Sequence, residues 1–163
     1  MYTNYSNLRF LGENMKDFMK DAYKEAIKAY EKNEVPIGCV IVKDGNIISR
    51  AHNLREKSNL ATSHSEILCI EKACKKLKSW RLDGCEMYVT LEPCLMCAGA
   101  ITQARIKKVY IGTSDEKNGC VGSIANVFLD INTTHKVEFE YVLDEKCSSI
   151  LSDFFKNLRK NKI

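Results

Sequence analysis

Two hydrophobic periods alternate along this chain, and each change of period marks the start of a new predicted element. Between residues 15 and 32, apolar side chains recur every three or four positions among charged ones, which predicts an amphipathic helix. Two short runs rich in valine and isoleucine then flank Asp44-Gly45-Asn46, a sequence typical of a tight turn. These runs, residues 37–43 and 47–52, predict a β-hairpin.

The rest of the chain continues this alternation and predicts an α/β fold. Residues 53–63 are polar and show little periodicity, so we expect a loop there. A strand, a helix and another strand follow one another between residues 86 and 112, an order that predicts a parallel crossover connection. The residue pattern thus favours helices that cover a mainly parallel sheet. The remaining predicted helices lie at 64–77, 94–104, 124–129 and 144–160, and the remaining strands at 86–91, 107–112 and 136–142.

Length and composition restrict the setting of this fold. With 163 residues, and about 150 residues per domain as a guide, we expect a single domain over residues 15–163. No apolar run is long enough to span a membrane or to act as a signal peptide near Met1, so we expect a cytoplasmic protein without a membrane partner. Residues 1–14 show neither a helix nor a strand pattern. We interpret them as a disordered or non-native extension, with Met15 as the natural first residue.

Charge and cysteine content limit the kinds of partner and of cysteine chemistry to expect. The formal net charge of +4, from 25 basic and 21 acidic residues, is too mild to indicate nucleic-acid binding by itself. Four of the basic residues fall between positions 156 and 162, where no acidic residue occurs, and a basic end complements a helix dipole. Eight cysteines in a chain of this length without an export signal indicate free thiols or metal ligands rather than disulfides.

Two short segments supply the residues of a candidate metal site, His64, Cys94 and Cys97. One imidazole and two thiolates are ligands that Zn²⁺ favours, and three protein ligands leave the fourth position open for water. Cys94 and Cys97 lie three residues apart at the start of a predicted helix, so their side chains share a face near its positive dipole end. His64 begins another predicted helix. The two helix N-termini can meet at the carboxyl edge of the sheet, where α/β proteins place ligands.

Glu66 completes this candidate site as a proton carrier. It lies two residues from His64 and therefore points away from the ligand direction along the helix. A structural zinc site would require a fourth cysteine or histidine, but His52 and His135 are isolated in the sequence and no second CxxC segment occurs. The CxxC segment alone leaves redox chemistry open. The complete set favours hydrolysis by an activated water molecule.

A resemblance to a known superfamily rests on His64-Ser65-Glu66 and Pro93-Cys94-Leu95-Met96-Cys97. These segments match the HxE and PCxxC signature of the zinc-dependent nucleoside and nucleobase deaminases. Within that superfamily, the chain from residue 15 to residue 159 most resembles the bacterial tRNA-specific adenosine deaminases. The matching positions are 35–38, 53, 62–66, 89–100, 105–106, 115, 117, 119, 122–123 and 151–155.

This resemblance implies a reaction, a cofactor and an assembly. The reaction is hydrolytic conversion of adenosine to inosine at the wobble position of a tRNA anticodon, typically that of an arginine tRNA. His64, Cys94 and Cys97 would hold one Zn²⁺ per subunit, and the zinc would activate a hydroxide ion. Glu66 would carry protons from the zinc-bound water to the adenine ring and to the departing ammonia. The resemblance also implies a homodimer and a cytidine-deaminase-like, three-layer α/β/α fold with a central mixed sheet of about five strands.

The resemblance also assigns a pocket for the adenine base. Asn53 would hydrogen-bond the flipped base, while Val35, Pro36 and the backbone around Ser65 would shape the pocket. Ser65 is a departure from the family, which commonly has a small alanine between the histidine and the glutamate. This difference leaves zinc ligation intact and bears on how the RNA loop is held.

Further contacts with the tRNA anticodon loop come from the second half of the chain. By the same resemblance, Asp115 would contact the ribose of a neighbouring nucleotide, and Phe155 on the basic terminal helix would approach the anticodon loop. Thr113-Ser114 precede Asp115 at positions where relatives often carry a basic residue that could approach phosphate.

Two alternative functions remain open. A guanine deaminase, or another deaminase of small nucleobases, would share the fold and the catalytic motifs; segment 115–123 and the terminal Phe154-Phe155 pair favour tRNA instead. A nonenzymatic RNA-binding module stabilised by zinc belongs to a different class of protein. Glu66 and the missing fourth protein ligand oppose it.

Overall fold

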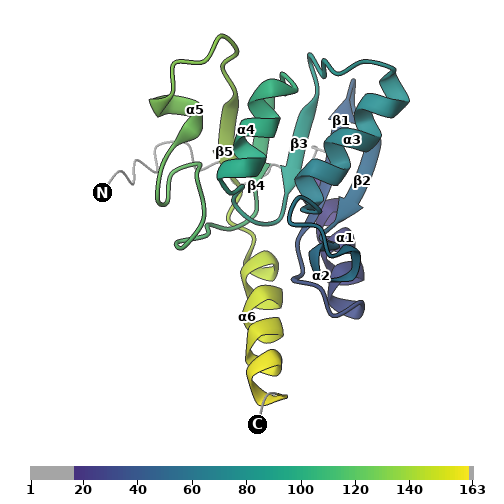
Figure 1. The fold of residues 1–163 in the computed structure, drawn as a ribbon, viewed down its shortest axis with the longest axis vertical. Helices are drawn as coiled ribbons and strands as arrows, with labels where there is room; N and C mark the ends of the chain where they lie inside the picture. The colour runs from purple at the N-terminus through teal and green to yellow at the C-terminus, as the bar shows by residue number, and fades with distance from the viewer. Residues whose placement is uncertain (1–16, 162–163) are drawn as a thin grey trace.

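A mixed five-stranded sheet forms the centre of the molecule (Figure 1). The computed structural model describes residues 17–161, so the predicted extension over residues 1–14 and the predicted start at Met15 lie outside the described residues. The strands run in the spatial order β2-β1-β3-β4-β5. Their bounds are β1 (Gly38–Lys43), β2 (Asn46–His52), β3 (Glu86–Val89), β4 (Lys108–Ile111) and β5 (Glu138–Tyr141).

Strand directions divide this sheet into two halves. β1 pairs in the antiparallel direction with β2 and with β3, whereas β3 and β4, and then β4 and β5, form parallel pairs. The α/β class, the hairpin, the parallel crossover from β3 to β4 and the mixed sheet are confirmed. The expected parallel direction holds for β2, β3, β4 and β5, whereas β1 runs opposite to them and makes both of its strand pairs antiparallel.

One face of the sheet is covered by helices that follow β2, β3 and β4 in the chain (Figure 1). Alternate strand residues such as Cys39 and Ile41 point into this side of the core. Gly38, Val40 and Val42 are also buried and Lys43 is half-buried, so this strand is apolar almost throughout and carries no alternation of polar positions. The covering helices are α3 (Ser65–Leu77), α4 (Leu95–Gln103) and α5 (Val127–Asp130).

The opposite face is covered by α1 (Phe18–Glu31), which lies very close to β1. A Cβ atom on Gly38 would overlap the carbonyl oxygen of Ala22 and the amide nitrogen of Ala26. α6 (Glu145–Lys160) starts on this face through Cys147 and then extends beyond the edge of the sheet (Figure 1). Within residues 17–161, none of the helices combines the length and apolar character needed to cross a membrane.

A short helix, α2 (Arg55–Ser58), occupies part of the segment predicted as a loop. The buried carboxylate of Glu34 accepts hydrogen bonds from the backbone N–H groups of Lys57 at 2.6 Å and Glu56 at 3.2 Å. It satisfies amides that a helix N-terminus leaves free, and it complements the helix dipole. The prediction of a loop over the whole segment is wrong because the group that stabilises α2 comes from a distant part of the sequence.

A buried glutamate links α1 to the end of β2. Glu25 accepts hydrogen bonds from Lys28 Nζ at 2.6 Å and from His52 Nδ1 at 2.9 Å. Burial alone would raise the pKa of this carboxyl, but the hydrogen bonds from Lys28 and His52 outweigh it and hold the pKa below its usual value. The folded protein therefore stabilises the charged form of Glu25.

Replacing Gly38 with alanine is expected to destabilise the protein by about 2 kcal/mol or more, because the added methyl group must push α1 away from β1. Denaturant unfolding followed by circular dichroism measures the change. Gly99→Ala is the control, since a Cβ on this glycine of α4 meets open space. Alanine there should leave stability unchanged or raise it by up to about 1 kcal/mol. Equal stability of the two variants would contradict the close approach of α1 to β1.

Glu25→Gln is expected to lower the free energy of unfolding by about 1–3 kcal/mol at neutral pH. The folded-state pKa lies below the unfolded-state value, so this contribution is complete above the unfolded pKa of about 4.3 and is lost as the pH falls through the folded pKa. Denaturant titrations from neutral to acidic pH measure it. Glu31→Gln, at an exposed position of α1, is the control. A deficit of Glu25→Gln that stays constant on acidification would show that the carboxylate is not responsible.

Candidate active site

His64, Cys94 and Cys97 meet between two helix N-termini. His64 is the N-cap residue of α3, and Cys94 is the N-cap residue of α4. His64 Nδ1 lies 3.6 Å from the Sγ atom of Cys94 and 3.6 Å from that of Cys97. All three ligand atoms lie within 4.8 Å of one another. The structure therefore brings the two sequence motifs together at one point.

The spacing of these atoms fits a tetrahedral zinc ion. Zinc bonds of about 2.3 Å to sulfur and about 2.0 Å to nitrogen, at the tetrahedral angle, separate a nitrogen ligand from a sulfur ligand by about 3.6 Å. That is the separation between His64 Nδ1 and each of the two thiols. Within residues 17–161, this cluster is the group of three side chains whose ligand atoms lie close enough together to hold a metal ion. Three protein ligands leave one coordination position open.

The charge of the cluster depends on its two cysteines together. A hydrogen bond with Cys97, assisted by one with His64, lowers the pKa of Cys94 to about 4. The same hydrogen bond, together with burial, raises the pKa of Cys97, so the two thiols titrate as a coupled pair. The hydrogen bond with Cys94 also raises the pKa of His64. A divalent cation that binds all three groups displaces their protons, because thiolates and neutral imidazole are the ligand forms.

Glu66 lies in the first turn of α3, with its side chain buried. Burial raises the pKa of this carboxyl, and the nearby charge of Cys94 acts in the same direction. Ser65 is fully buried, and its Oγ donates a hydrogen bond to Glu66 Oε2 at 2.9 Å. The Ser65 side chain therefore orients Glu66, a contact that alanine could not make. A carboxyl group with a raised pKa suits proton transfer near neutral pH.

Asn53, Val35 and Pro36 lie together beside α2. Asn53 is buried, and its amide nitrogen donates to the carbonyl oxygen of Val35 at 3.4 Å. Its side-chain oxygen accepts a hydrogen bond from the backbone N–H of Arg55 at 3.3 Å. Pro36 is buried and Val35 is half-buried. The positive charge of Arg55 acts to lower the pKa of His64, which indicates that this segment lies near the cluster.

Glu34 supports this segment, a role that the sequence analysis missed. Its Oε2 lies 3.5 Å from Asn53 Nδ2 and also accepts the N–H of Glu56 at the start of α2. The residue is only 1% exposed. In the sequence it is one more acid at the polar end of an amphipathic helix. Its position directly before the matching segment 35–38 is the one signal that could have singled it out.

Asp115 begins a loop that borders the cluster. One of its carboxylate oxygens, Oδ1, accepts hydrogen bonds from the backbone N–H groups of Lys117 at 3.1 Å and Asn118 at 3.2 Å, which closes a turn. Gly119 of the same loop forms a backbone bridge with Cys94. The structure thus places Asp115 on a loop that is paired directly with a metal-ligand segment.

Phe155 lies on α6, which leaves the sheet at the same edge as the cluster. β3, β4 and β5 are parallel, so the helices that follow β3 and β5 both start at the carboxyl ends of these strands. Phe155 is 41% exposed and packs edge-on against Phe154, with ring centroids 5.5 Å apart. Phe154 contacts Tyr30 of α1, and Asn157 donates a hydrogen bond to the Tyr30 hydroxyl at 2.9 Å. Phe155 therefore lies on a projecting helix rather than within the cluster (Figure 1).

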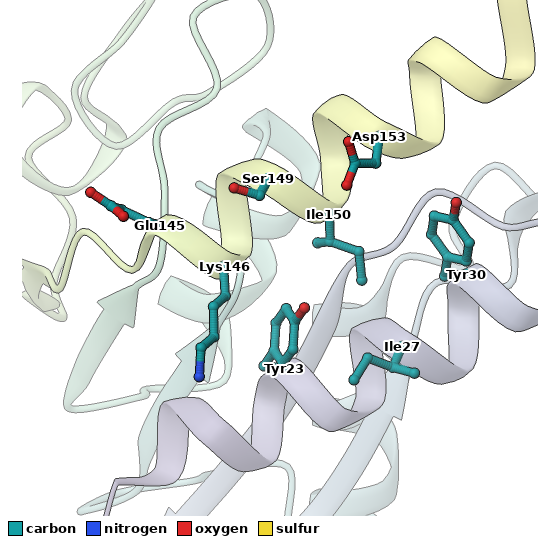
Figure 2. A pocket seen from close by; sticks show the side chains of 8 residues that line it. All are labelled: Tyr23, Ile27, Tyr30, Glu145, Lys146, Ser149, Ile150 and Asp153. Carbon is teal, nitrogen blue, oxygen red and sulfur yellow. The ribbon is translucent and has the colours of Figure 1, made fainter.

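A cavity of about 400 Å³ lies between α1 and α6, apart from the cluster (Figure 2). Two tyrosines and Ile27 line it from α1, facing Lys146, Ile150 and Asp153 on α6. None of its lining residues belongs to the candidate site. The cavity is therefore separate from the candidate site at the two helix N-termini.

A mixed α/β sheet that brings one histidine, two cysteines and a buried glutamate together at two helix N-termini matches the arrangement of the zinc-dependent deaminases. Enzymes of this class remove an amino group by hydrolysis of a C–N bond. The family model of the MafB19-like deaminases matches residues 13–159, and the chain belongs to this deaminase family.

Individual relatives agree with this assignment. Over 146 residues, the chain is 51% identical to the tRNA-specific adenosine deaminase of Bacillus subtilis (strain 168), a match that covers 89% of this chain and 91% of the relative. A solved structure from studies of A-to-I editing by tRNA:A34 deaminases shows a TM-score of 0.79 and 43% identity, covering 82% of this chain and 98% of its own. The guanine deaminase structure from Bacillus subtilis shows a TM-score of 0.60 and 32% identity, covering 88% and 94% of the two chains. The expected cytidine-deaminase-like fold is confirmed.

Cys97→Ala is expected to weaken zinc binding by more than about a hundredfold, because it removes one of three ligands. Competition with a chromophoric chelator measures the affinity. Cys74→Ala is the matched control, since this cysteine of α3 lies outside the cluster and should leave the affinity unchanged. Wild-type zinc affinity in Cys97→Ala would exclude the cluster as the metal site.

Proposed function

We propose that this deaminase converts adenosine to inosine at the wobble position of a tRNA anticodon. The observation that carries the proposal is the high sequence identity, over nearly the whole chain, to proteins named for this reaction. The candidate site contains the groups that such a reaction needs, a cluster of metal ligands and a buried carboxyl. An arginine tRNA is the substrate that the family resemblance suggests.

In this proposal, His64, Cys94 and Cys97 hold one Zn²⁺ per subunit. When bound, this ion would act as a Lewis acid and would lower the pKa of a water molecule to about 7. Glu66 accepts a proton from the attacking water and donates it to the ring nitrogen beside C6. It then assists the departure of the amino group as ammonia, so that water and adenosine yield inosine and ammonia. Ser65 keeps the Glu66 carboxylate in one orientation during these transfers.

Asn53, Val35 and Pro36 receive the extruded adenine in this proposal. A base of an anticodon loop is already unpaired, so its extrusion costs less than flipping a base out of a duplex. Asp115 and Phe155 contact the flanking nucleotides from the loop after β4 and from α6. Exposed basic residues of α6 lie beside Phe155 to meet phosphate, namely Lys156, Arg159 and Lys160.

A second copy of the chain is the proposed partner of an apolar surface beside the site. Leu95 follows Cys94 directly and is 63% exposed. Ile124, Leu129 and Ile131, around α5, are exposed as well, and α5 contacts α4. Exposed apolar surfaces of this kind often mark interfaces, and two-fold homodimers are the commonest closed assemblies. Each site would then lie close to the partner subunit.

The cytoplasmic location stays a prediction.

Guanine deamination is the second candidate function, favoured by the similarity to the guanine deaminase of Bacillus subtilis. This identity, 32%, is lower than the 51% shared with the tRNA-specific adenosine deaminase of the same organism. A nonenzymatic module stabilised by zinc would need no buried carboxyl beside its metal ligands. The position of Glu66 therefore disfavours it.

The protein is expected to form inosine in an anticodon stem-loop with a wobble adenosine and to leave free guanine and cytidine unchanged. Chromatography of the digested nucleosides measures the product. Glu66→Ala should retain zinc and lose at least about a hundredfold in turnover, since general acid–base catalysis contributes that much. Glu71→Ala, at an exposed position of α3, is the control. Deamination of guanine with the RNA untouched would overturn the proposed function.

A further inference from the structure

Glu92 is a buried carboxylate that the proposed chemistry does not use. It follows β3 in the chain, lies two residues before Cys94 and is 2% exposed. Its Oε2 accepts hydrogen bonds from the backbone N–H of Asp115 at 2.9 Å and from the Ser123 hydroxyl. Its Oε1 accepts hydrogen bonds from the backbone N–H groups of Val121 and Ser123, both at 3.0 Å.

All of these donors belong to one loop, residues 112–126, which joins β4 to α5. Asp115 near the start of the loop and Ser123 near its end bond to the same carboxylate. A buried carboxylate without donors is costly, and so are buried amides without acceptors. The backbone N–H of Glu92 also donates to the carbonyl oxygen of Thr113 at 2.9 Å. Glu92 therefore links the start and the end of the loop through one buried side chain.

The same loop borders the metal ligands. The Cys120 N–H donates to the Pro93 carbonyl oxygen at 2.9 Å, and Gly119 forms its bridge with Cys94. A Cβ on Gly119 would overlap the carboxylate of Glu92, so the loop packs against this side chain without spare room. These contacts make the loop one wall of the candidate site, at a fixed position relative to the cluster.

We propose that Glu92 is a positioning residue, which holds the 115–123 wall in its RNA-binding conformation before the substrate arrives. It acts through Asp115 and does not touch the nucleotide. This inference rests on the proposed function, in which Asp115 contacts the RNA. A wall that is ordered in advance spares the substrate the entropy cost of ordering it. Loss of this order raises KM more than it lowers the rate of the chemical step.

Glu92→Gln tests the proposal. An amide has one acceptor oxygen, and its NH₂ group would face N–H donors, so it can satisfy only one side of the loop. With the anticodon stem-loop, KM is expected to rise about tenfold while kcat changes by less than about twofold. In the free enzyme, hydrogen exchange at the amides of Val121 and Ser123 is expected to accelerate about tenfold or more. Zinc content, and the absorption spectrum of the cobalt-substituted protein, should match the wild type.

Glu138→Gln is the matched control, because it makes the same change at an exposed position where β5 begins, far from the carboxyl edge. Unchanged KM and unchanged exchange in Glu92→Gln would overturn the proposal. An altered cobalt spectrum would overturn it as well, since Glu92 would then act through the metal ligands. RNA left unmodified by the wild type, with exchange still accelerated in Glu92→Gln, would refute the proposed function and keep the role of Glu92 in ordering the loop.

Ser123→Ala keeps the proposal testable where Glu92→Gln does not fold. Ser123 is exposed, and its replacement removes one hydroxyl donor while the backbone amides remain. A smaller rise in KM, about threefold, together with faster exchange at Val121, is expected. Wild-type values of both quantities in Ser123→Ala would overturn the proposal.

Discussion

The position of β1 between β2 and β3 is the constraint on which the rest of the site depends. Because β1 runs antiparallel to both neighbours, β2 and β3 point the same way and end at the same edge of the sheet. α3 and α4 follow these two strands, so both N-termini come to that edge. Paired hydrogen bonds of 3.0 Å between Gly38 and Thr90 hold β1 against the end of β3. This pairing brings His64 within reach of Cys94, 30 residues further along the chain.

Local patterns predicted most helices and strands, and the metal cluster, because each depends on neighbouring residues or on ligand chemistry. The direction of β1 against β3 could not be predicted in this way, since alternation of apolar residues does not encode long-range pairing. α2 was not predicted, because the carboxylate that caps it belongs to Glu34, which lies in a distant part of the sequence. Glu92 lies within the matching segment 89–100, but its hydrogen-bond donors come from a later loop, which local patterns do not reveal. The contacts of Asn53, Asp115 and Phe155 with RNA stay predictions.

Two buried acids, Glu34 and Glu92, each support a segment of the candidate site. Each accepts hydrogen bonds mainly from backbone N–H groups, of α2 in one case and of the loop after β4 in the other. Hydrogen bonds to an ionised carboxylate are among the stronger ones in proteins. Because these anchors use the main chain, the side chains of the two segments remain available for recognition. The scaffold of the site is thus largely independent of the groups that would select its substrate.

The attachment of α6 has a mechanical consequence. The helix is held near its start by burial of Cys147, and further along by Phe154 and Asn157, which both meet Tyr30 of α1. The cavity between the two helices is lined by residues of α6 from Glu145 to Asp153 (Figure 2). The later contacts are made with α1, on the face of the sheet away from α3 and α4. The terminal helix is therefore attached to the molecule independently of the two helices that carry the cluster.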